Sequence, residues 1–205
     1  LRLSASQVDK AASCRFAYFM RYGLRARERK EITVDPAEFG TFVHYILEHT
    51  ARDVCEAGGF SRVSLERTQE LAMEYAGRYR REYFAGLGER TSRQDYLLER
   101  NLQELRAVVR ELWEELAQSR FQPAGFEVQF GPGGAMPPVE IPGGAMPAQL
   151  RGFVDRLDLY ERDGQTYVRV VDYKTGRKDF DYCDVLNGLG LQMLLYLFAL
   201  ESYQR

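Results

Sequence analysis

The sequence predicts an α/β (α+β) fold in which helices flank a central mixed sheet and the first half of the chain is mainly helical. Apolar residues recur at helical spacing over residues 1–120, whereas residues 121–205 alternate with the period of strands before a closing helix. Pro123 marks the change, and six of the seven prolines fall between Pro123 and Pro147. Helices, three strands and a helix, in that order, favour one domain over residues 1–205.

Two helices are predicted near the start of the chain. Ser4-Ala-Ser-Gln7 has the pattern of a capping box, which opens a helix toward Met20. Pro36 precedes a second helical stretch that runs to about Ala57. Gly58-Gly59 ends this second helix.

A long amphipathic helix is predicted between Thr91 and Leu116. Its apolar residues recur at spacings of four and three, which places them on one face of a helix. This stripe, which we interpret as core, consists of Leu98, Leu102, Leu105, Val109, Leu112 and Leu116.

Three strands and a closing helix are predicted after Pro123. The strands are Phe126 to Phe130, Leu150 to Tyr160 and Thr166 to Thr175, and Arg162-Asp-Gly164 forms a hairpin turn between the last two. The closing helix covers about Asp184 to Tyr203.

A proline-rich insertion separates the first two strands. It contains the pentapeptide Gly-Gly-Ala-Met-Pro twice, at Gly133 to Pro137 and Gly143 to Pro147. Because proline cannot donate to a sheet ladder, we expect a turn-rich insertion or an edge hairpin here.

Composition excludes few functions. With 28 basic and 30 acidic side chains the formal net charge is −2, which neither indicates nor excludes a nucleic-acid partner. Three scattered cysteines (Cys14, Cys55 and Cys183) and no signal peptide predict a cytoplasmic protein without a disulfide framework. The longest apolar stretch is too short to span a membrane. The chain does not begin with methionine, so we expect a piece of a longer protein.

Charged residues interrupt two strands at positions that we expect to be buried. Asp155 lies in the row of Phe153, and Asp172 and Lys174 continue the row of Val170. A buried carboxylate needs a partner. The simpler alternative is a structural salt bridge between Asp172 and Lys174, and the other is a metal ion.

Two carboxylates that face one cleft favour a divalent cation, and their hard oxygen ligands suit magnesium or manganese. A metal ion that polarises a phosphoryl oxygen, beside a lysine that neutralises developing charge, is suited to hydrolysis of a phosphodiester. His44, four residues after Gly40, is a possible further ligand, although a lone histidine is more often a packed or surface residue.

Several motifs in order resemble those of RecB-family nucleases in the PD-(D/E)XK superfamily, and most closely the AddB-type nuclease domains of bacterial helicase-nucleases. The resemblance covers most of the chain except residues 61–119 and the proline-rich insertion. The motifs are Cys14-Arg-Phe-Ala-Tyr-Phe-Met-Arg-Tyr-Gly23, Gly40-Thr-Phe-Val-His44, Gly152-Phe-Val-Asp155-Arg-Leu-Asp158, Val171-Asp172-Tyr-Lys174-Thr-Gly176 and Gly190-Leu-Gln192-Met-Leu-Leu-Tyr196.

The resemblance implies a restriction-endonuclease-like core and a role for each motif residue. It implies that Gln192 and Tyr196 orient the site and contact DNA and that Lys174 is the catalytic lysine. The family often carries an acid at the place of Glu127, but Glu127 shares its strand face with Gln129, so we expect it to have an outer, supporting place. The implied ligands of Mg²⁺ or Mn²⁺ are His44, Asp155, Asp172 and the backbone carbonyl of Tyr173.

As a function, the resemblance implies an exonuclease that hydrolyses single-stranded DNA, the 5′-terminated strand, during processing of double-strand breaks. It implies an AddA-type helicase-nuclease subunit as partner. Two alternatives stay open: a noncatalytic DNA-end-binding scaffold with the same fold, and a stand-alone CRISPR-associated RecB-like exonuclease.

Cys14 and a basic segment are the remaining candidates. In related domains a cysteine near Cys14 helps to hold a 4Fe–4S cluster, which needs four thiolates; we expect no cluster in this chain unless a longer parent supplies three more. Arginines interleaved with aromatic residues form either a solvated face or a surface that suits single-stranded DNA. They are Arg21, Arg25, Arg27 and Arg29, with Arg78, Arg80 and Arg81 beside Tyr79 as a second cluster.

Overall fold

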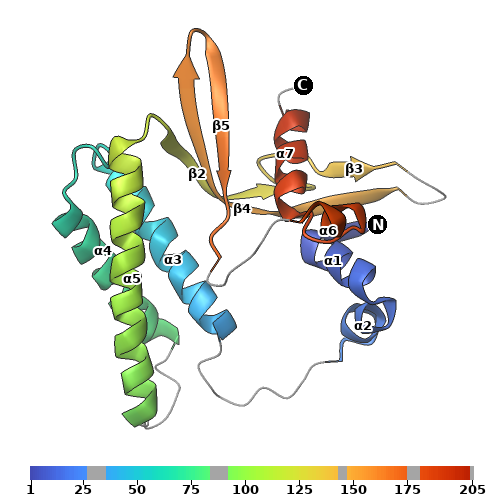
Figure 1. Cartoon of the computed structure of the whole chain (residues 1–205), viewed down its shortest axis with the longest axis horizontal. Helices are drawn as coiled ribbons and strands as arrows, with labels where there is room; N and C mark the ends of the chain where they lie inside the picture. The colour runs from blue at the N-terminus through green and yellow to red at the C-terminus, as the bar shows by residue number, and fades with distance from the viewer. Residues whose placement is uncertain (27–35, 84–91, 143–146, 175–180, 204–205) are drawn as a thin grey trace. The chain divides into compact units, whose positions relative to one another are not determined.

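A computed structural model describes residues 1–26, 36–83, 92–142, 147–174 and 181–203. The chain divides into two compact units, each described by itself. The strand unit comprises Leu1–Ile32, Glu127–Leu157 and Val170–Arg205, and the helical unit comprises Thr33–Phe126 and Asp158–Arg169. Figure 1 shows the elements of both units.

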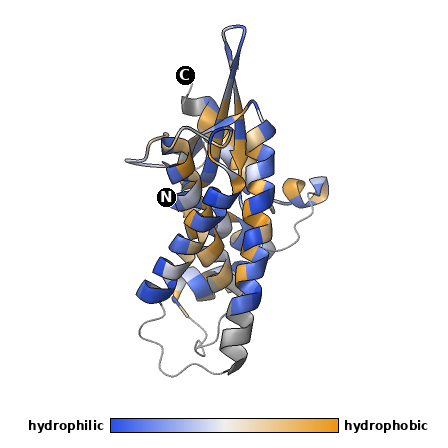
Figure 2. Ribbon diagram, turned by 90° about the vertical axis from the view of Figure 1, so that its left-hand side faces the viewer, coloured by the Kyte–Doolittle hydropathy of each residue, from blue (hydrophilic) through white to orange (hydrophobic). Residues whose placement is uncertain are grey.

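The helical unit is built on three helices that each contact the other two: α3 (Pro36–Glu56), α4 (Leu65–Tyr83) and α5 (Ser92–Gln118). They lie side by side in Figure 1, and along them hydrophilic and hydrophobic residues alternate in Figure 2. The predicted apolar stripe is confirmed where side chains are described, because Leu105, Val109, Leu112 and Leu116 are all buried.

Both predicted boundaries of α3 are confirmed. The helix begins at Pro36, whose missing N–H is no loss in a first turn. It ends before Gly58 and Gly59, which have φ angles of 107° and 93°. Only glycine adopts such angles without strain, so this pair stops the helix.

A mixed sheet is centred on β4 (Ala148–Arg162), as predicted, and β4 belongs to the strand unit as far as Leu157. β1 pairs with β4 in parallel, and β3 pairs with β4 antiparallel on its other side. β2 and β5 also pair with β4. The bounds of these strands are Arg2–Ser4 for β1, Gln122–Phe130 for β2, Val139–Ile141 for β3 and Gln165–Val171 for β5. β3 fulfils the expectation of an edge strand inside the proline-rich insertion, whose residues 143–146 lie outside the described part.

The opening capping box is confirmed, but the single helix to Met20 is wrong. The Gln7 N–H donates to Ser4 Oγ at 3.3 Å, and the Ser4 N–H donates to Gln7 Oε1 at 2.8 Å. Helix α1 (Ala5–Ser13) then ends at Cys14, whose extended backbone (φ −162°) separates it from α2 (Arg15–Tyr18) and a π-helix (Phe19–Gly23). The cysteine sulfur caps α2 and so favours a new start.

The single closing helix is also wrong, since two helices occupy that stretch: α6 (Tyr182–Leu186) and α7 (Gln192–Tyr203). Gly188 and Gly190 lie between them with φ angles of 79° and 64°. This left-handed backbone cannot continue a right-handed helix. The break lets α7 begin at Gln192, and α7 packs on α1 and β3.

Two further strand predictions need correction. β5 ends at Val171 and does not continue to Thr175, so Asp172 and Lys174 follow the strand. On β4 the row of Phe153 is not a buried apolar face: Phe153 is 51% exposed, whereas Val154 and Arg156 on the other face are buried. The turn at Asp163 and Gly164 is confirmed, with φ angles of 53° and 75°.

Among the described residues, no helix is both long enough and apolar enough to cross a membrane.

Candidate functional site

Two carboxylates approach each other in the strand unit. Glu127 on β2 and Asp155 on β4 each present a carboxylate oxygen, and these two oxygens lie within 4.8 Å. Two negative charges at this separation repel, and a divalent cation between them relieves the repulsion. Oxygen ligands of this kind suit magnesium or manganese, so the pair fits the metal that the sequence predicts.

The backbone at Glu127 explains why this acid reaches Asp155. Its φ angle of 47° lies in the left-handed region, which costs a residue with a side chain about 1–3 kcal/mol. Such a residue interrupts the regular alternation of a strand and re-aims its side chain. The prediction that Glu127 has an outer, supporting place assumed a regular strand, in which Glu127 and Gln129 share a face. Because the strand is irregular at Glu127, this residue lies closer to Asp155 than predicted.

Asp155 is nearly buried and is tied to the segment that follows β5. It is 9% exposed, and its Oδ2 accepts a hydrogen bond of 2.7 Å from the backbone N–H of Tyr173. Tyr173 lies between Asp172 and Lys174 in the sequence. This hydrogen bond therefore joins β4 to the segment that carries Asp172 and Lys174.

Asp172 accepts hydrogen bonds from three side chains. The Gln192 amide donates to Oδ1 at 3.0 Å, the Tyr196 hydroxyl is 3.5 Å from the same oxygen, and Lys174 Nζ lies 2.7 Å from Oδ2. The salt bridge of the simpler alternative is thus present. The amide and the phenol, both from α7, add to it and fix the direction of the carboxylate.

Tyr196 is fixed by packing. It is 3% exposed, and its ring meets the ring of Phe130 edge-on at 5.8 Å. Gly152 makes room for this packing, because a Cβ there would lie 2.7 Å from the Phe130 ring. Burial, with the nearby charge of Asp172, raises the pKa of the Tyr196 phenol, whereas the Gln192 hydrogen bond lowers it. The phenol therefore keeps its proton and remains a donor.

Lys174 combines an ion pair with access to solvent. Its side chain is 36% exposed, while the Asp172 side chain that it contacts is 7% exposed. An ammonium group in this position can meet a phosphate that approaches from solvent. The cluster therefore offers carboxylates to hold a cation and one ammonium to neutralise an anion.

The remaining predictions concern His44 and the two basic clusters. His44 is half-buried on α3 in the helical unit, and its part in the site stays a prediction. Arg21 and Arg25 are exposed in the strand unit, and Arg27 and Arg29 lie outside the described residues. The second basic cluster was wrong in one respect: Tyr79 is 7% exposed and packs against Phe42, so it presents no ring for stacking.

Cys14 does not fit an iron–sulfur cluster within this chain. Its thiol is exposed, and its sulfur accepts the Ala17 N–H at 3.5 Å. Four thiolates are needed and the sequence has three cysteines, of which Cys55 belongs to the helical unit.

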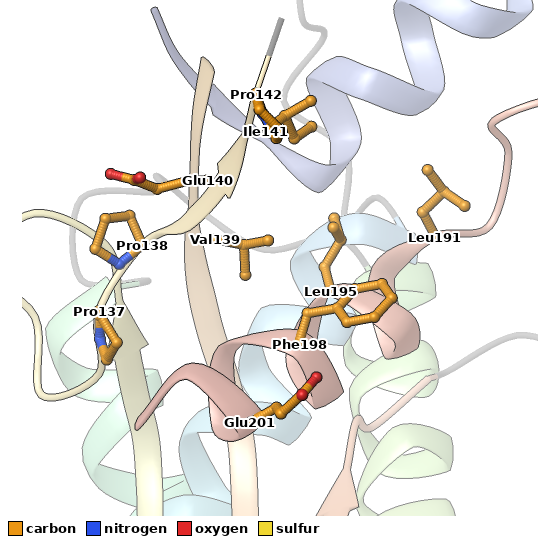
Figure 3. A pocket seen from close by; sticks show the side chains of 10 residues that line it. All are labelled: Pro137, Pro138, Val139, Glu140, Ile141, Pro142, Leu191, Leu195, Phe198 and Glu201. Atoms are coloured by element: carbon orange, nitrogen blue, oxygen red, sulfur yellow. The ribbon is translucent and has the colours of Figure 1, made fainter. Parts of the chain in front are cut away.

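An apolar groove is a separate feature of the strand unit. It has a volume of about 720 Å³ and lies between the proline-rich insertion, which includes β3, and one face of α7. Figure 3 shows Val139, Leu195 and Phe198 on its walls, with Glu140 and Glu201 also among the residues that line it. Its lining does not include the acids described above.

Known proteins resemble this chain along its whole length. A family model described as the PD-(D/E)XK nuclease superfamily matches residues 2–205. Proteins named as the B subunit of an ATP-dependent helicase/deoxyribonuclease are 36% identical to it in Clostridium novyi, in Ruminiclostridium cellulolyticum and in Caldanaerobacter subterraneus. Each match covers 98% of this chain, which spans 18% of the length of each relative.

Proposed function

Because this chain belongs to the PD-(D/E)XK nuclease superfamily, we propose that it is a metal-dependent exonuclease domain that hydrolyses single-stranded DNA. The observation that carries the proposal is the convergence of Gln192, Tyr196 and Lys174 on the carboxylate of Asp172. Partners at both oxygens fix the orientation of the carboxylate, as outer hydrogen bonds do for the ligands of a metal ion.

We propose that Glu127, Asp155 and Asp172 hold the metal, with the carbonyl of Tyr173 and with His44 as further ligands. When bound, a divalent ion of this kind polarises a phosphoryl oxygen and lowers the pKa of a bound water. The carboxylate pair supports the choice, since Glu127 and Asp155 oxygens within 4.8 Å gain from a cation between them. Magnesium or manganese suits these ligands best.

The other side chains orient and neutralise. Gln192 and Tyr196 direct Oδ1 of Asp172, and the protonated phenol keeps donating when the pH rises above neutrality. Lys174 faces solvent on one side and Asp172 on the other, so it neutralises the charge that develops on the scissile phosphate. We give it the role of the catalytic lysine.

The proposed substrate strand is supported by the exposed surface of α2 and the π-helix. Arg21 in the π-helix and Arg25 shortly after it are exposed, and Phe16 and Phe19 are 71% and 54% exposed. The Arg21 guanidinium lies 5.7 Å above the ring of Tyr22. Arginine for phosphates and aromatic rings for unstacked bases are the groups that bind single strands without reading sequence.

The names of the relatives support a place in a helicase-nuclease. We propose that the domain belongs to an AddB-type protein, receives the 5′-terminated strand from an AddA-type partner, and acts in the cytoplasm during repair of double-strand breaks. The exonuclease direction and the partner come from the family resemblance.

The test is degradation of labelled single-stranded DNA by the full-length protein with its helicase partner, in Mg²⁺ or Mn²⁺. Asp172→Ala and Lys174→Ala are expected to abolish degradation while DNA binding and ATP hydrolysis continue. Full activity in both variants would contradict the proposal. It would favour the scaffold alternative, in which the Asp172–Lys174 bridge is only structural.

A further inference from the structure

We infer that Arg156 is a positioning residue for this site, because it fixes Tyr173 and through it the two neighbours, Asp172 and Lys174. The inference rests on the proposed nuclease function. It assigns a role to a residue that directly follows Asp155 in the sequence and points to the opposite face of β4.

A buried arginine at this place requires an explanation. Arg156 is 1% exposed and lies in the buried row of β4 with Val154. Arginine is rarely buried unless it is paired, because removing its charge from water is unfavourable. An apolar residue would fill the same row of the sheet without that cost.

The guanidinium group of Arg156 contacts the side chain of Tyr173. One guanidinium nitrogen donates to the Tyr173 hydroxyl at 2.9 Å, and the guanidinium carbon lies 5.7 Å from the centre of the same ring. Asp155 meanwhile accepts the Tyr173 N–H at 2.7 Å. Two consecutive residues of β4 thus hold one residue at two points, its backbone and the far end of its side chain.

These two contacts matter because Tyr173 lies beyond the end of β5, where the hydrogen bonds of the sheet do not position the chain. β5 ends at Val171, so residues 172–174 lie beyond the strand ladder. Side chains have to position them instead: the Gln192 amide directs Asp172, and Arg156 directs the residue between the acid and the lysine. A shift of Tyr173 would move both charged neighbours, since they are bonded to it directly.

Arg169 offers a matched comparison. It is a partly buried arginine near the same hairpin, and its partners are two acids of the helical unit, Asp158 at 2.7 Å and Glu115 at 2.6 Å. Its contacts are structural. If loss of a buried arginine affects only folding, variants of Arg156 and of Arg169 should both lose stability. An effect on the site should appear only in the variant of Arg156.

The experiment uses Arg156→Met, Tyr173→Phe and the double variant in the full-length protein with its partner, with Arg169→Met as control. For each, we would measure nuclease kcat, KM for single-stranded DNA, the Mn²⁺ concentration that gives half the maximal rate, and thermal unfolding. Tyr173→Phe keeps the ring and the backbone, so it tests the hydrogen bond even if Arg156→Met does not fold.

We expect Tyr173→Phe and Arg156→Met each to lower kcat and to raise the half-saturating Mn²⁺ concentration by about tenfold to a hundredfold, with KM for DNA unchanged. The double variant should have the same kcat and Mn²⁺ dependence as the less active single variant, because both substitutions remove the same interaction. Arg169→Met should change unfolding alone.

Unchanged kcat and Mn²⁺ dependence in Tyr173→Phe would overturn the inference, as would fully additive effects in the double variant. Failure of the proposed function would look different: the wild-type protein itself would then show no metal-dependent degradation.

Discussion

The helical unit and the strand unit use their polar side chains differently. In the helical unit the Tyr75 hydroxyl donates to Asp53 at 2.7 Å and the Trp113 indole donates to the Val63 carbonyl at 2.9 Å, so each of these two donors has one structural acceptor. In the strand unit several donors converge on the carboxylates of Asp155 and Asp172.

This difference separates stability from function. One donor for one acceptor satisfies a buried group and stabilises a fold. Donors that converge on one acid, beside another pair of acids that repel, leave the folded protein with a charge arrangement that a bound cation would improve. We therefore expect substitutions at the one-to-one contacts of the helical unit to change unfolding, and those at the acids of the strand unit and their donors to change turnover.

The largest effect is expected for Asp155→Asn. The amide keeps the shape of the side chain but removes the charge that faces Glu127, so degradation of single-stranded DNA should fall by at least about a thousandfold. The measurement is a time course in Mg²⁺ with the full-length protein and its partner. A decrease of less than tenfold would mean that Asp155 is not a ligand.

Tyr196→Phe should have a smaller effect on the same unit. The substitution removes the hydroxyl near Asp172 but keeps the ring against Phe130. We expect kcat to decrease by about tenfold, with little change in unfolding, because orienting groups around metal ligands typically contribute this much. If kcat is unchanged while stability falls, Tyr196 serves the core and not the site.

Tyr75→Phe tests the helical unit. It removes the bond to Asp53, and we expect the free energy of unfolding to fall by about 2 kcal/mol. Nuclease activity should stay at the wild-type level well below the unfolding temperature. Urea unfolding and the nuclease time course, measured on the same preparation, check both parts, and a loss of turnover without loss of stability would contradict the contrast between the units.

The pH dependence of stability gives an independent check on Tyr75. Burial, together with the hydrogen bond to Asp53, raises the pKa of its phenol from 10.0 to about 12. Between pH 10 and 12 the unfolded tyrosine loses its proton while the folded one retains it, so stability decreases as the pH rises through this window. Tyr75→Phe should remove that part of the decrease, which unfolding measured at several pH values would show.

The smallest expected effect is that of Ser4→Ala, which removes the cap of α1 in the strand unit. We expect a loss of about 1 kcal/mol in the free energy of unfolding, because one N–H at the start of the helix loses its acceptor. Turnover should not change. Ser4→Asp retains an acceptor at this position and should restore stability, which identifies the cap as the cause.

Local signals in the sequence were sufficient where a few adjacent residues determine the structure. The capping box at Ser4, the glycine stop at Gly58 and the apolar stripe that ends at Leu116 were predictable for this reason. The pair of Asp172 and Lys174 was predictable too, because two residues apart in an extended segment share a side.

The rest depends on contacts between distant residues. β1 is three residues long, too short for a periodic pattern, and exists because Leu3 pairs with Leu150. The place of Glu127 depends on one left-handed residue in a strand. Arg156 was missed because a charged residue in a buried row gives no sign of its partner until Tyr173 is placed beside it.

Binding of Mn²⁺ tests the central claim most directly, because it does not require turnover or DNA. The titration, followed by electron paramagnetic resonance, compares the full-length wild-type protein with Glu127→Gln, Asp155→Asn and Asp172→Asn, and uses Tyr75→Phe as the control from the helical unit. We predict that each of the three strand-unit variants weakens binding at least tenfold and that Tyr75→Phe binds like the wild type. Equal Mn²⁺ affinity in the wild type and all three acid variants would contradict the account.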